Sequence, residues 1–426
     1  MTSPIHIGPI HIGIDARVAP GAFGGVAEVL GLYARSLSFL DPAEFRFTLL
    51  CDRKLDVGWL RAVIPDHARI LLTSEGDFET RKVVVPIRRN RLSEKLFGLT
   101  APMQQFGMPV QDASAVWRRE GVDLVHLPFQ FAIDSDLPTI YHPHDLQHIH
   151  LPDYFSRDDL IGREATYQYF CHKATYVACT SRWIAQDLLA QYDLPPDRVR
   201  IVPWATTTGE VPEPDIGRIK RVLSRHGLVP DGYMLLPAQT WPHKNHLGAI
   251  RALDRLRQTH GLRPLLICTG SLNAHAQALY QEIARLGLGD QVRFLGYVDR
   301  EDLSTLYQFA RFTLIPTKFE AGSAPLWDAF TLGCPVTCAT TTSLPSQSHG
   351  GAHLFDPEDI GQIAEAIRVM WLDAGLRQRL VAIGTEAVKP YSWDMTARGF
   401  GILYKQALSR SISEADRAFM NSLPVY

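Results

Sequence analysis

Short apolar runs alternate along the chain with longer stretches in which apolar residues recur every three or four positions. The short runs in the first half lie at 11–16, 46–51, 123–128, 137–142, 175–180 and 199–203, and those in the second half lie at 233–238, 264–270, 291–296, 311–317 and 334–339. Between them, stretches such as 25–37 and 181–192 have the period of an amphipathic helix. Strands that alternate with helices predict α/β domains with parallel sheets covered on both faces.

The alternation is interrupted at 203–215, a segment with three prolines and no apolar period. We therefore expect two α/β halves of comparable size. In doubly wound sheets, ligands bind at the carboxyl ends of the strands. The pattern predicts a small-molecule site, most simply for a nucleotide, between the two halves.

The composition is that of an ordinary globular protein, with 46% hydrophobic and 21% charged residues. A formal net charge of −2 argues against a nucleic acid as the partner. The six cysteines form no Cys-x-x-Cys pair, which favours reduced thiols and a cytoplasmic location. The N-terminus has no secretory-signal pattern, and no apolar run approaches the roughly 20 residues of a membrane span, so we expect a soluble protein.

Three glycines, Gly21, Gly24 and Gly25, fall between the first predicted strand and its helix. Glycine lets the backbone approach an anion closely, and a helix N-terminus offers free N–H groups and a favourable dipole. The Gly-x-Gly-x-x-Gly spacing of dinucleotide-binding folds is absent. A plain tight turn is the alternative interpretation.

Four histidines follow the strand at 137–142, namely His142, His144, His148 and His150. A zinc site would need further ligands at a suitable spacing, and alternating residues of an extended segment point to opposite faces. We therefore predict no metal site here. His144, next to Asp145, is expected to face the site, and the other three histidines are expected to be loop or packing residues.

Two turns in the second half carry candidate anion ligands. Lys244 follows the strand at 233–238, where its ammonium would meet a phosphate, although a solvated lysine in a first helical turn is the alternative. The residues 322–324 (Gly322, Ser323 and Ala324) lead into a proline that suits the first turn of a helix, and their N–H groups would cradle a phosphate. Glu320 and Asp328 flank this turn, where carboxylates suit sugar hydroxyls better than phosphate.

The segment FEAGSAPLWDAFTLGCPV (319–336) resembles the Glu-x7-Glu signature region of the retaining, nucleotide-sugar-dependent glycosyltransferases of the large group 1 family, which have the GT-B fold. Further segments similar to that family are PAQTWPHKNH, CTSRWIAQDL, VRFLGYVDREDLSTLY, HDLQHIHLPDYFS and YSWDMTARGF. The likeness runs from about residue 11 to 409 and is that of a PHKNH-type subgroup.

The resemblance implies two Rossmann-like, doubly wound parallel-sheet domains that face each other across a cleft. The N-terminal, acceptor-binding domain would span 1–207, with 397–426 crossing back onto it, and the domain that binds the nucleotide sugar would span 208–396. The resemblance further implies a hexosyltransferase without metal or other cofactor. Its expected acceptor is a saccharide or a lipid-linked sugar in bacterial surface polysaccharide assembly.

Carried over by position, Glu320 is expected to contact the transferred sugar, and Asp328 stands where a second Glu binds the ribose diol. His144 matches the histidine near the reacting sugar, and Lys244 matches the phosphate-binding lysine. Gln239 stands where the family commonly has Arg, with Lys318 as a candidate replacement cation. The remaining donor-binding positions implied by the resemblance are Gly24, Gly25, Tyr297, Val298, Gly322, Ser323 and Ala324.

Other functions stay open at this point. Gln239 and the shorter Asp328 leave room for a catalytically silent binding or scaffold subunit. A sugar-nucleotide epimerase or phosphorylase shares the architecture but not these motifs, and an oxidoreductase lacks its dinucleotide fingerprint. The motifs do not specify the donor: a GDP-mannose-like donor is favoured, and a deoxyhexose nucleotide and a UDP-sugar stay open.

The segment 81–95 is basic and interleaved with apolar residues, with six basic residues and one acidic residue, Glu94. This composition suggests a peripheral contact with the anionic inner face of a membrane, through which the domain would reach a lipid-linked acceptor. A solvated loop and helix face is the alternative.

Overall fold

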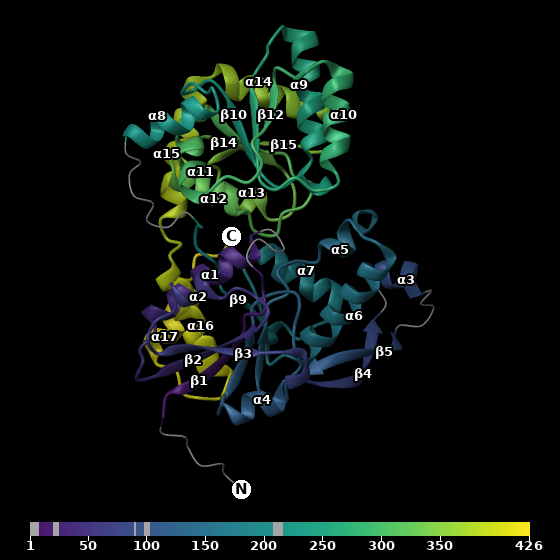
Figure 1. Cartoon of the computed structure of the whole chain (residues 1–426), viewed down its shortest axis with the longest axis vertical. Coiled ribbons are helices and arrows are strands. Elements are labelled where there is room, and N and C mark those ends of the chain that lie inside the picture. Colours follow the sequence, from purple (N-terminus) through teal and green to yellow (C-terminus); the bar gives the residue numbers. More distant parts are fainter. Residues whose placement is uncertain (1–7, 20–24, 89–90, 98–102, 208–215) are drawn as a thin grey trace. The chain divides into compact units, whose positions relative to one another are not determined.

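The computed structural model describes residues 8–19, 25–88, 91–97, 103–207 and 216–426. The chain divides into two compact units, each built around one large sheet (Figure 1). The first unit comprises 1–205 and 391–425, and the second comprises 206–390 together with Tyr426. The sequence placed these boundaries at 207/208 and 396/397.

The first unit contains a seven-stranded parallel sheet in the order β3-β2-β1-β6-β7-β8-β9. Its strands are β1 (Ile10–Asp15), β2 (Phe45–Asp52), β3 (Ala68–Thr73), β6 (Leu124–Leu127), β7 (Thr139–Tyr141), β8 (Tyr176–Cys179) and β9 (Val199–Ile201). The order reverses between β1 and β6, which is the topological switch point of a doubly wound sheet. Six of these strands match the predicted runs, whereas β3 was not foreseen.

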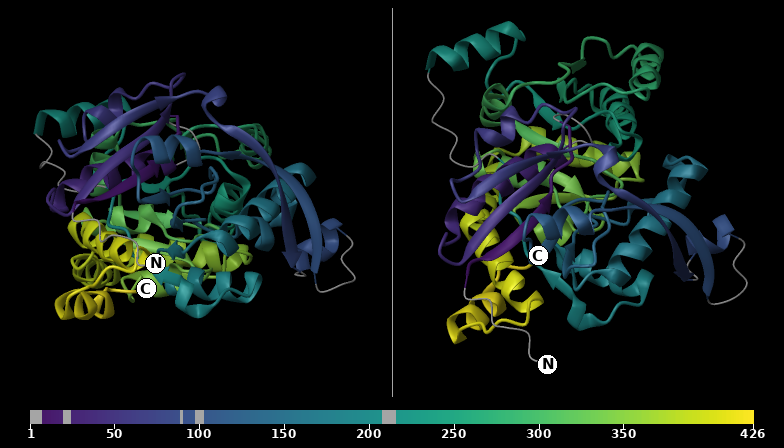
Figure 2. Two further views of the ribbon diagram at one scale, coloured as in Figure 1. Left: turned by 90° about the horizontal axis from the view of Figure 1, so that it is seen from below. Right: turned by 60° about the horizontal axis from the view of Figure 1, so that its bottom comes forward.

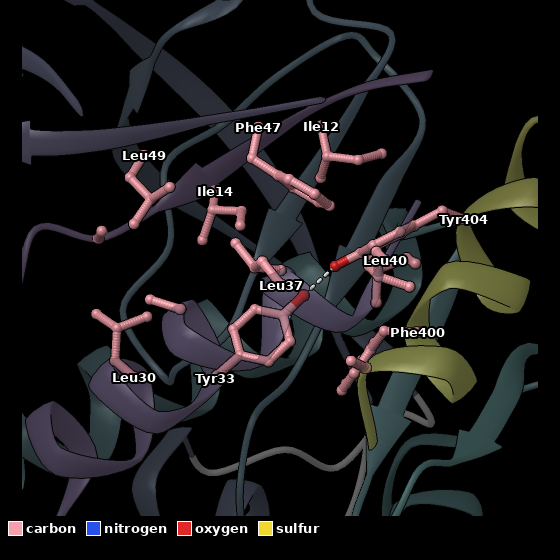
Figure 3. Close-up of a cluster of buried hydrophobic side chains, with 14 of the residues drawn as sticks. Ile12, Ile14, Leu30, Tyr33, Leu37, Leu40, Phe47, Leu49, Phe400 and Tyr404 are labelled. Atoms are coloured by element: carbon pink, nitrogen blue, oxygen red, sulfur yellow. Dashed lines mark hydrogen bonds between the residues drawn. The ribbon is translucent and has the colours of Figure 1, made fainter. Parts of the chain in front are cut away.

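The helices of this unit come from both ends of the chain. They are α1 (Val26–Ser36), α2 (Gly58–Arg61), α3 (Arg91–Phe97), α4 (Ser114–Arg119), α5 (Gln147–His150), α6 (Arg157–Lys173), α7 (Arg182–Tyr192), α16 (Trp393–Ala407) and α17 (Glu414–Ser422). Figure 3 shows Tyr33 of α1 and Tyr404 of α16 joined by a hydrogen bond between their hydroxyls, beside the apolar residues of β1 and β2. The C-terminal helix α16 is thus part of the first unit's core.

An antiparallel hairpin of β4 (Glu79–Arg88) and β5 (Met103–Asp112) extends from the seven-stranded sheet, with α3 at its end (Figures 1 and 2). The alternative interpretation of 81–95 as a solvated loop and helix face is therefore wrong for its first half, which belongs to strand β4. Val85 and Ile87 are buried against α6, and Leu92 and Leu96 of α3 are buried too. These four apolar residues therefore pack inside the protein, whereas Val84 is exposed.

The second unit contains a six-stranded parallel sheet in the order β12-β11-β10-β13-β14-β15. Its strands are β10 (Met234–Pro237), β11 (Leu266–Thr269), β12 (Val292–Phe294), β13 (Phe312–Ile315), β14 (Val336–Ala339) and β15 (Ala352–Phe355). The switch point lies between β10 and β13. The first five strands were predicted, whereas β15 was not.

Helices surround the second sheet. They are α8 (Ile216–Arg225), α9 (His246–His260), α10 (Ala276–Leu286), α11 (Arg300–Phe309), α12 (Ala324–Thr331), α13 (Leu344–Gln347), α14 (Ile360–Leu372) and α15 (Ala374–Val388). All six cysteines of the chain are free and buried. In the part of the chain that the structure describes, no helix combines the length and the apolar character needed to cross a bilayer.

Candidate functional site

A small pocket in the second unit lies at the switch point of its sheet. The carboxyl ends of β10 and β13 line it, together with Lys244, Glu320 and Pro325. The strand order leaves a crevice at this end of the sheet, because the loops that follow β10 and β13 run to opposite faces of the sheet. Two residues chosen from the sequence on separate grounds therefore line one pocket.

Lys244 and Glu320 form an ion pair inside this pocket. The ammonium Nζ donates a hydrogen bond of 2.7 Å to Oε2 of Glu320, and the two side chains are 21% and 10% exposed. Lys244 is held at this place by Asn245, which adopts a left-handed conformation with φ of 57° and caps α9 through the N–H of Gly248. An ammonium has three donors, so two remain after the bond to Glu320.

The loop that carries Glu320 is braced by hydroxyl groups that follow β14. The backbone N–H of Glu320 donates to Oγ1 of Thr342 at 2.9 Å, and the carbonyl of Glu320 accepts from the Ser343 hydroxyl at 2.7 Å. Thr341 donates to the carbonyl of Lys318 at 3.1 Å. The sequence reasoning missed these residues, although the run of hydroxyls at 340–343 directly after a predicted strand is a signal for them.

The start of α12 differs from the predicted cradle of three amides. The side chain of Ser323 caps the helix by accepting from the N–H of Leu326 at 3.4 Å. The N–H of Ser323 donates to Oε1 of Gln347 at 2.8 Å, and its carbonyl accepts from Nε2 of Gln347 at 3.0 Å. A buried amide side chain needs such partners. The candidate anion cradle therefore narrows to the amides of Gly322 and Ala324.

Asp328 lies on α12, as predicted, but it is already hydrogen-bonded within the second unit. Its two carboxylate oxygens accept from the backbone N–H of Thr207 at 3.0 Å and from the Thr207 hydroxyl at 2.6 Å. Both residues are buried. No signal in the sequence pointed to Thr207, because it lies in the segment that was predicted as an irregular boundary.

The pocket receives no second positive charge from the neutral Gln239 or from Lys318. Oε1 of Gln239 accepts a hydrogen bond of 2.9 Å from the indole N–H of Trp241, which is 46% exposed. The ammonium of Lys318 is paired with Glu358 at 2.7 Å and is not among the residues that line the pocket. The expectation that Lys318 replaces the missing arginine is therefore not supported by its contacts.

The residues expected at a nucleobase, Tyr297 and Val298, lie between β12 and α11. Tyr297 is 80% exposed and Val298 is half-buried. The preceding Gly296 accepts at its carbonyl from the N–H of Gly270 at 2.8 Å. Gly270 has a φ of 104°, and a Cβ there would lie 2.7 Å from the backbone N of Gln239. Glycine is thus needed to bring the loops after β10, β11 and β12 together.

His144 lies in the first unit, near the carboxyl end of β6 at that sheet's switch point. Its Nε2 lies 2.8 Å from the carbonyl oxygen of Pro128, so this nitrogen carries the proton and Nδ1 is left as an acceptor. Burial lowers the pKa of His144 to about 4, which keeps the ring neutral near pH 7. A pocket beside it is lined by α1, His126, Trp204 and Phe400.

The other histidines of the segment have separate partners. The ring of His142 stacks on Trp204 with centroids 4.7 Å apart. His148 pairs with the buried Glu164 at 3.0 Å, and His150 pairs with Asp187 at 2.8 Å. Among the described residues, no group of three or more His, Cys, Asp or Glu side chains is placed to hold a metal ion. The prediction that no metal takes part stays a prediction.

Of the glycines after β1, only Gly25 belongs to the described residues. It precedes α1 with a φ of −79°, and an added Cβ would meet no atom within 4 Å. There is therefore open space beside the start of this helix. Gly24, the second glycine predicted to approach a phosphate, and Gly21 lie outside the described residues.

Two family models match the chain. The model described as "Glycosyl transferases group 1" matches residues 229–387, which include both Lys244 and Asp328. The model described as "Glycosyltransferase Family 4" matches residues 66–208 in the first unit.

Curated relatives share about a quarter to a third of their aligned residues with this chain. The O-antigen chain mannosyltransferase B of Escherichia coli is 27% identical over 251 residues, which are 59% of this chain and 66% of that protein. The D-inositol 3-phosphate glycosyltransferase of Acidothermus cellulolyticus is 30% identical over 241 residues, which are 54% of this chain and 53% of that protein. The chain thus spans less than two thirds of the length of these relatives.

Solved structures match nearly the whole chain. HepE of Anabaena, in complex with UDP and glucose, superposes with a TM-score of 0.65 at 16% identity, over 93% of this chain and 100% of that one. WaaG, a glycosyltransferase involved in lipopolysaccharide biosynthesis, superposes with a TM-score of 0.64 at 14% identity, over 93% and 99% of the two chains. At this level of identity the likeness shows the fold, and the predicted GT-B fold is confirmed.

Proposed function

We propose that this chain, which belongs to the group 1 glycosyltransferases of the GT-B fold, transfers a hexose or deoxyhexose from a nucleoside diphosphate sugar to a saccharide or lipid-linked acceptor. The observation that carries the proposal is the Lys244–Glu320 pair in the pocket between β10 and β13. A cation and a carboxylate side by side suit a ligand that carries both phosphates and sugar hydroxyls. The switch point of a doubly wound sheet is where such ligands bind.

The chemistry of transfer explains why these groups are needed. Cleavage of the anomeric C–O bond leaves negative charge on the departing diphosphate and develops positive charge on the sugar. The ammonium of Lys244 and the N-terminal end of α12 stabilise the departing anion. The carboxylate of Glu320 accepts hydrogen bonds from hydroxyls of the transferred sugar. In the first unit, the unprotonated Nδ1 of His144 is left to accept a hydrogen bond from a substrate hydroxyl.

The stereochemical part of the proposal is retention of the anomeric configuration. The leaving phosphate would take the proton of the acceptor hydroxyl as that hydroxyl attacks from the same face, so no protein nucleophile is assigned. An NMR analysis of the anomeric configuration in the product tests this point. An inverted product would contradict it.

The donor we propose is a GDP-mannose-like nucleotide sugar, and bacterial surface polysaccharide assembly is the proposed setting. Relatives named as an O-antigen chain mannosyltransferase and as a serotype-specific mannosyltransferase support mannose. A thermal-shift panel of GDP, UDP and dTDP discriminates the bases, because a ligand that binds only the folded state raises its stability. Stabilisation by UDP alone would contradict a GDP-linked donor.

We also propose a location at the cytoplasmic face of the membrane, with residues 81–95 as a peripheral contact. The structure weakens this idea, because Val85 and Ile87 are buried against α6 and Arg81 is paired with Asp112 and Asp134. The side chains of Arg88, Arg89 and Arg91 lie outside the described part of the chain. Sedimentation with anionic liposomes, before and after neutralising these three arginines, tests it. Unchanged sedimentation would contradict the contact.

The central test of the proposed function is the substitution Lys244→Gln. Because the neutral amide cannot stabilise the leaving diphosphate, we expect transfer to fall about 100-fold in kcat, as when one anion-stabilising donor is removed from an active site. The matched control is Lys389→Gln, a lysine of the same unit paired with the exposed Glu386. Steady-state rates on the donor identified by the thermal-shift panel provide the measurement.

Two outcomes separate this proposal from its alternative. Equal rates for wild type and Lys244→Gln would contradict the role of Lys244. Nucleotide binding without transfer or hydrolysis, on every donor and acceptor offered, would favour a catalytically silent binding subunit. Two observations support that alternative: Gln239 is uncharged, and Asp328 is already hydrogen-bonded to Thr207.

A further inference from the structure

Both carboxylate oxygens of Asp328 accept hydrogen bonds from one residue, Thr207. Oδ1 accepts from the backbone N–H of Thr207 at 3.0 Å, and Oδ2 accepts from the Thr207 hydroxyl at 2.6 Å. The exposed fractions of Asp328 and Thr207 are 7% and 8%. One threonine thus offers two neighbouring donors to the two oxygens of one carboxylate.

A ribose offers the same pattern of donors. Its vicinal hydroxyls are two adjacent O–H groups, and a carboxylate that accepts from both uses one oxygen for each. Asp328 is the position at which the family resemblance places this contact. Asp328 is only 7% exposed and both of its carboxylate oxygens already accept from Thr207, so we expect a ribose diol to displace these hydrogen bonds when it binds.

We propose that Thr207 is an internal ligand of the donor site that competes with the ribose of a nucleoside diphosphate for Asp328. The inference rests on the proposed function, since it requires a nucleotide to bind in the second unit. When the ribose binds, the two hydrogen bonds from Thr207 to the Asp328 carboxylate break, and two new ones form from the ribose hydroxyls to the same carboxylate. Thr207 therefore weakens the binding of ribonucleotides and leaves nucleotides without the diol unaffected.

The test is the substitution Thr207→Val in the full chain, which keeps the shape of the side chain and removes its hydroxyl. We measure binding of GDP and UDP by isothermal titration calorimetry, each in its ribose form and in a dideoxy form that lacks both hydroxyls. Because one charge-assisted hydrogen bond no longer has to be broken, we expect the Kd of the ribose forms to fall about tenfold. The Kd of the dideoxy forms is expected to stay unchanged.

Two further variants separate competition from a change in packing. Thr207→Ser keeps the hydroxyl and is expected to bind both forms as the wild type does. Thr331→Val is the matched control. Thr331 lies on α12, the helix that carries Asp328, and its hydroxyl donates to the carbonyl of Trp327 at 2.8 Å. If Thr207→Val does not fold by circular dichroism, Thr207→Ala takes its place with the same expectation.

Each outcome has a defined meaning. A selective gain for the ribose forms supports the competition. Equal Kd values for wild type and Thr207→Val, or the same gain for the dideoxy forms, would overturn it and leave the proposed function standing. If neither wild type nor variant binds any of the four nucleotides, the inference and the proposed function fail together.

Discussion

His144 adopts a backbone conformation that few residues other than glycine accept, with a φ of 66°. Such conformations persist where the surrounding structure holds them, and they are often found at functional sites. Here the imidazole is held by the carbonyl of Pro128 and lies edge-on to Trp204, with ring centroids 4.9 Å apart. The backbone strain at His144 thus coincides with an imidazole whose tautomer is fixed.

The substitution His144→Asn separates the role of the ring from the backbone conformation. Asparagine tolerates the left-handed region, so we expect the free energy of unfolding to change by less than about 2 kcal/mol. The amide can place Oδ1 near the position of Nδ1, but it has no donor that reaches the carbonyl of Pro128 as Nε2–H does. The acceptor then loses its fixed orientation, so transfer is expected to fall by at least about tenfold. Denaturant unfolding and steady-state rates check the two parts, and unchanged rates would remove His144 from the site.

The helices that carry candidate residues are fixed by polar side chains from distant elements. Gln347 of α13 holds the first turn of α12 through two hydrogen bonds to Ser323. In the first unit, the hydroxyl of Tyr404 on α16 lies 2.8 Å from Nδ1 of His126 on β6, and Tyr33 of α1 shares the same cluster. These contacts set the position of whole helices relative to the strand ends.

The substitution Tyr404→Phe tests how firmly α16 belongs to the first unit. It removes a buried hydroxyl with partners on α1 and β6, so we expect the free energy of unfolding to fall by about 1–3 kcal/mol. Tyr280→Phe is the control, because Tyr280 lies in the second unit and is 48% exposed. A substitution at such an exposed position is expected to change the free energy of unfolding by less than about 0.5 kcal/mol. Denaturant unfolding of the full chain measures both; equal midpoints would contradict the prediction.

At the scale of the whole molecule, both units keep buried histidines neutral. Burial lowers the pKa of His126 to about 3 and that of His246 to about 4, and it lowers the pKa of His142 well below its usual value. His126 and His142 belong to the first unit and His246 to the second. Unfolding exposes these rings, whose pKa then returns to about 6.5.

These shifts predict that the protein loses stability in mild acid. Below about pH 6.5 the unfolded chain binds protons that the folded chain does not, so stability is fully present above that pH and declines toward the folded pKa values. Each such histidine lowers the free energy of unfolding by up to about 1.4 kcal/mol per pH unit. Thermal unfolding at about pH 7 and pH 5 checks this, and equal midpoints would contradict it.

The sequence predicted the larger sheets because their strands are continuous apolar runs, which buried parallel strands require. It missed the hairpin of β4 and β5 because that segment mixes basic and apolar residues. Only the structure shows that Val85 and Ile87 face α6, so these two apolar residues form an internal contact and not part of a membrane surface. Gly24 and the side chains at the end of the hairpin lie outside the described residues.

By itself, the sequence determined the class of fold and the identity of Lys244 and Glu320 as candidates, because both depend on local pattern and on residue type. Only the tertiary structure decided which residues are partners. Lys244 and Glu320 are 76 residues apart, and Thr207 and Asp328 are 121 apart. Parallel strands bring the loops that carry Lys244 and Glu320 together at their carboxyl ends regardless of this separation. Neither periodicity nor composition records which side chains meet in either pair.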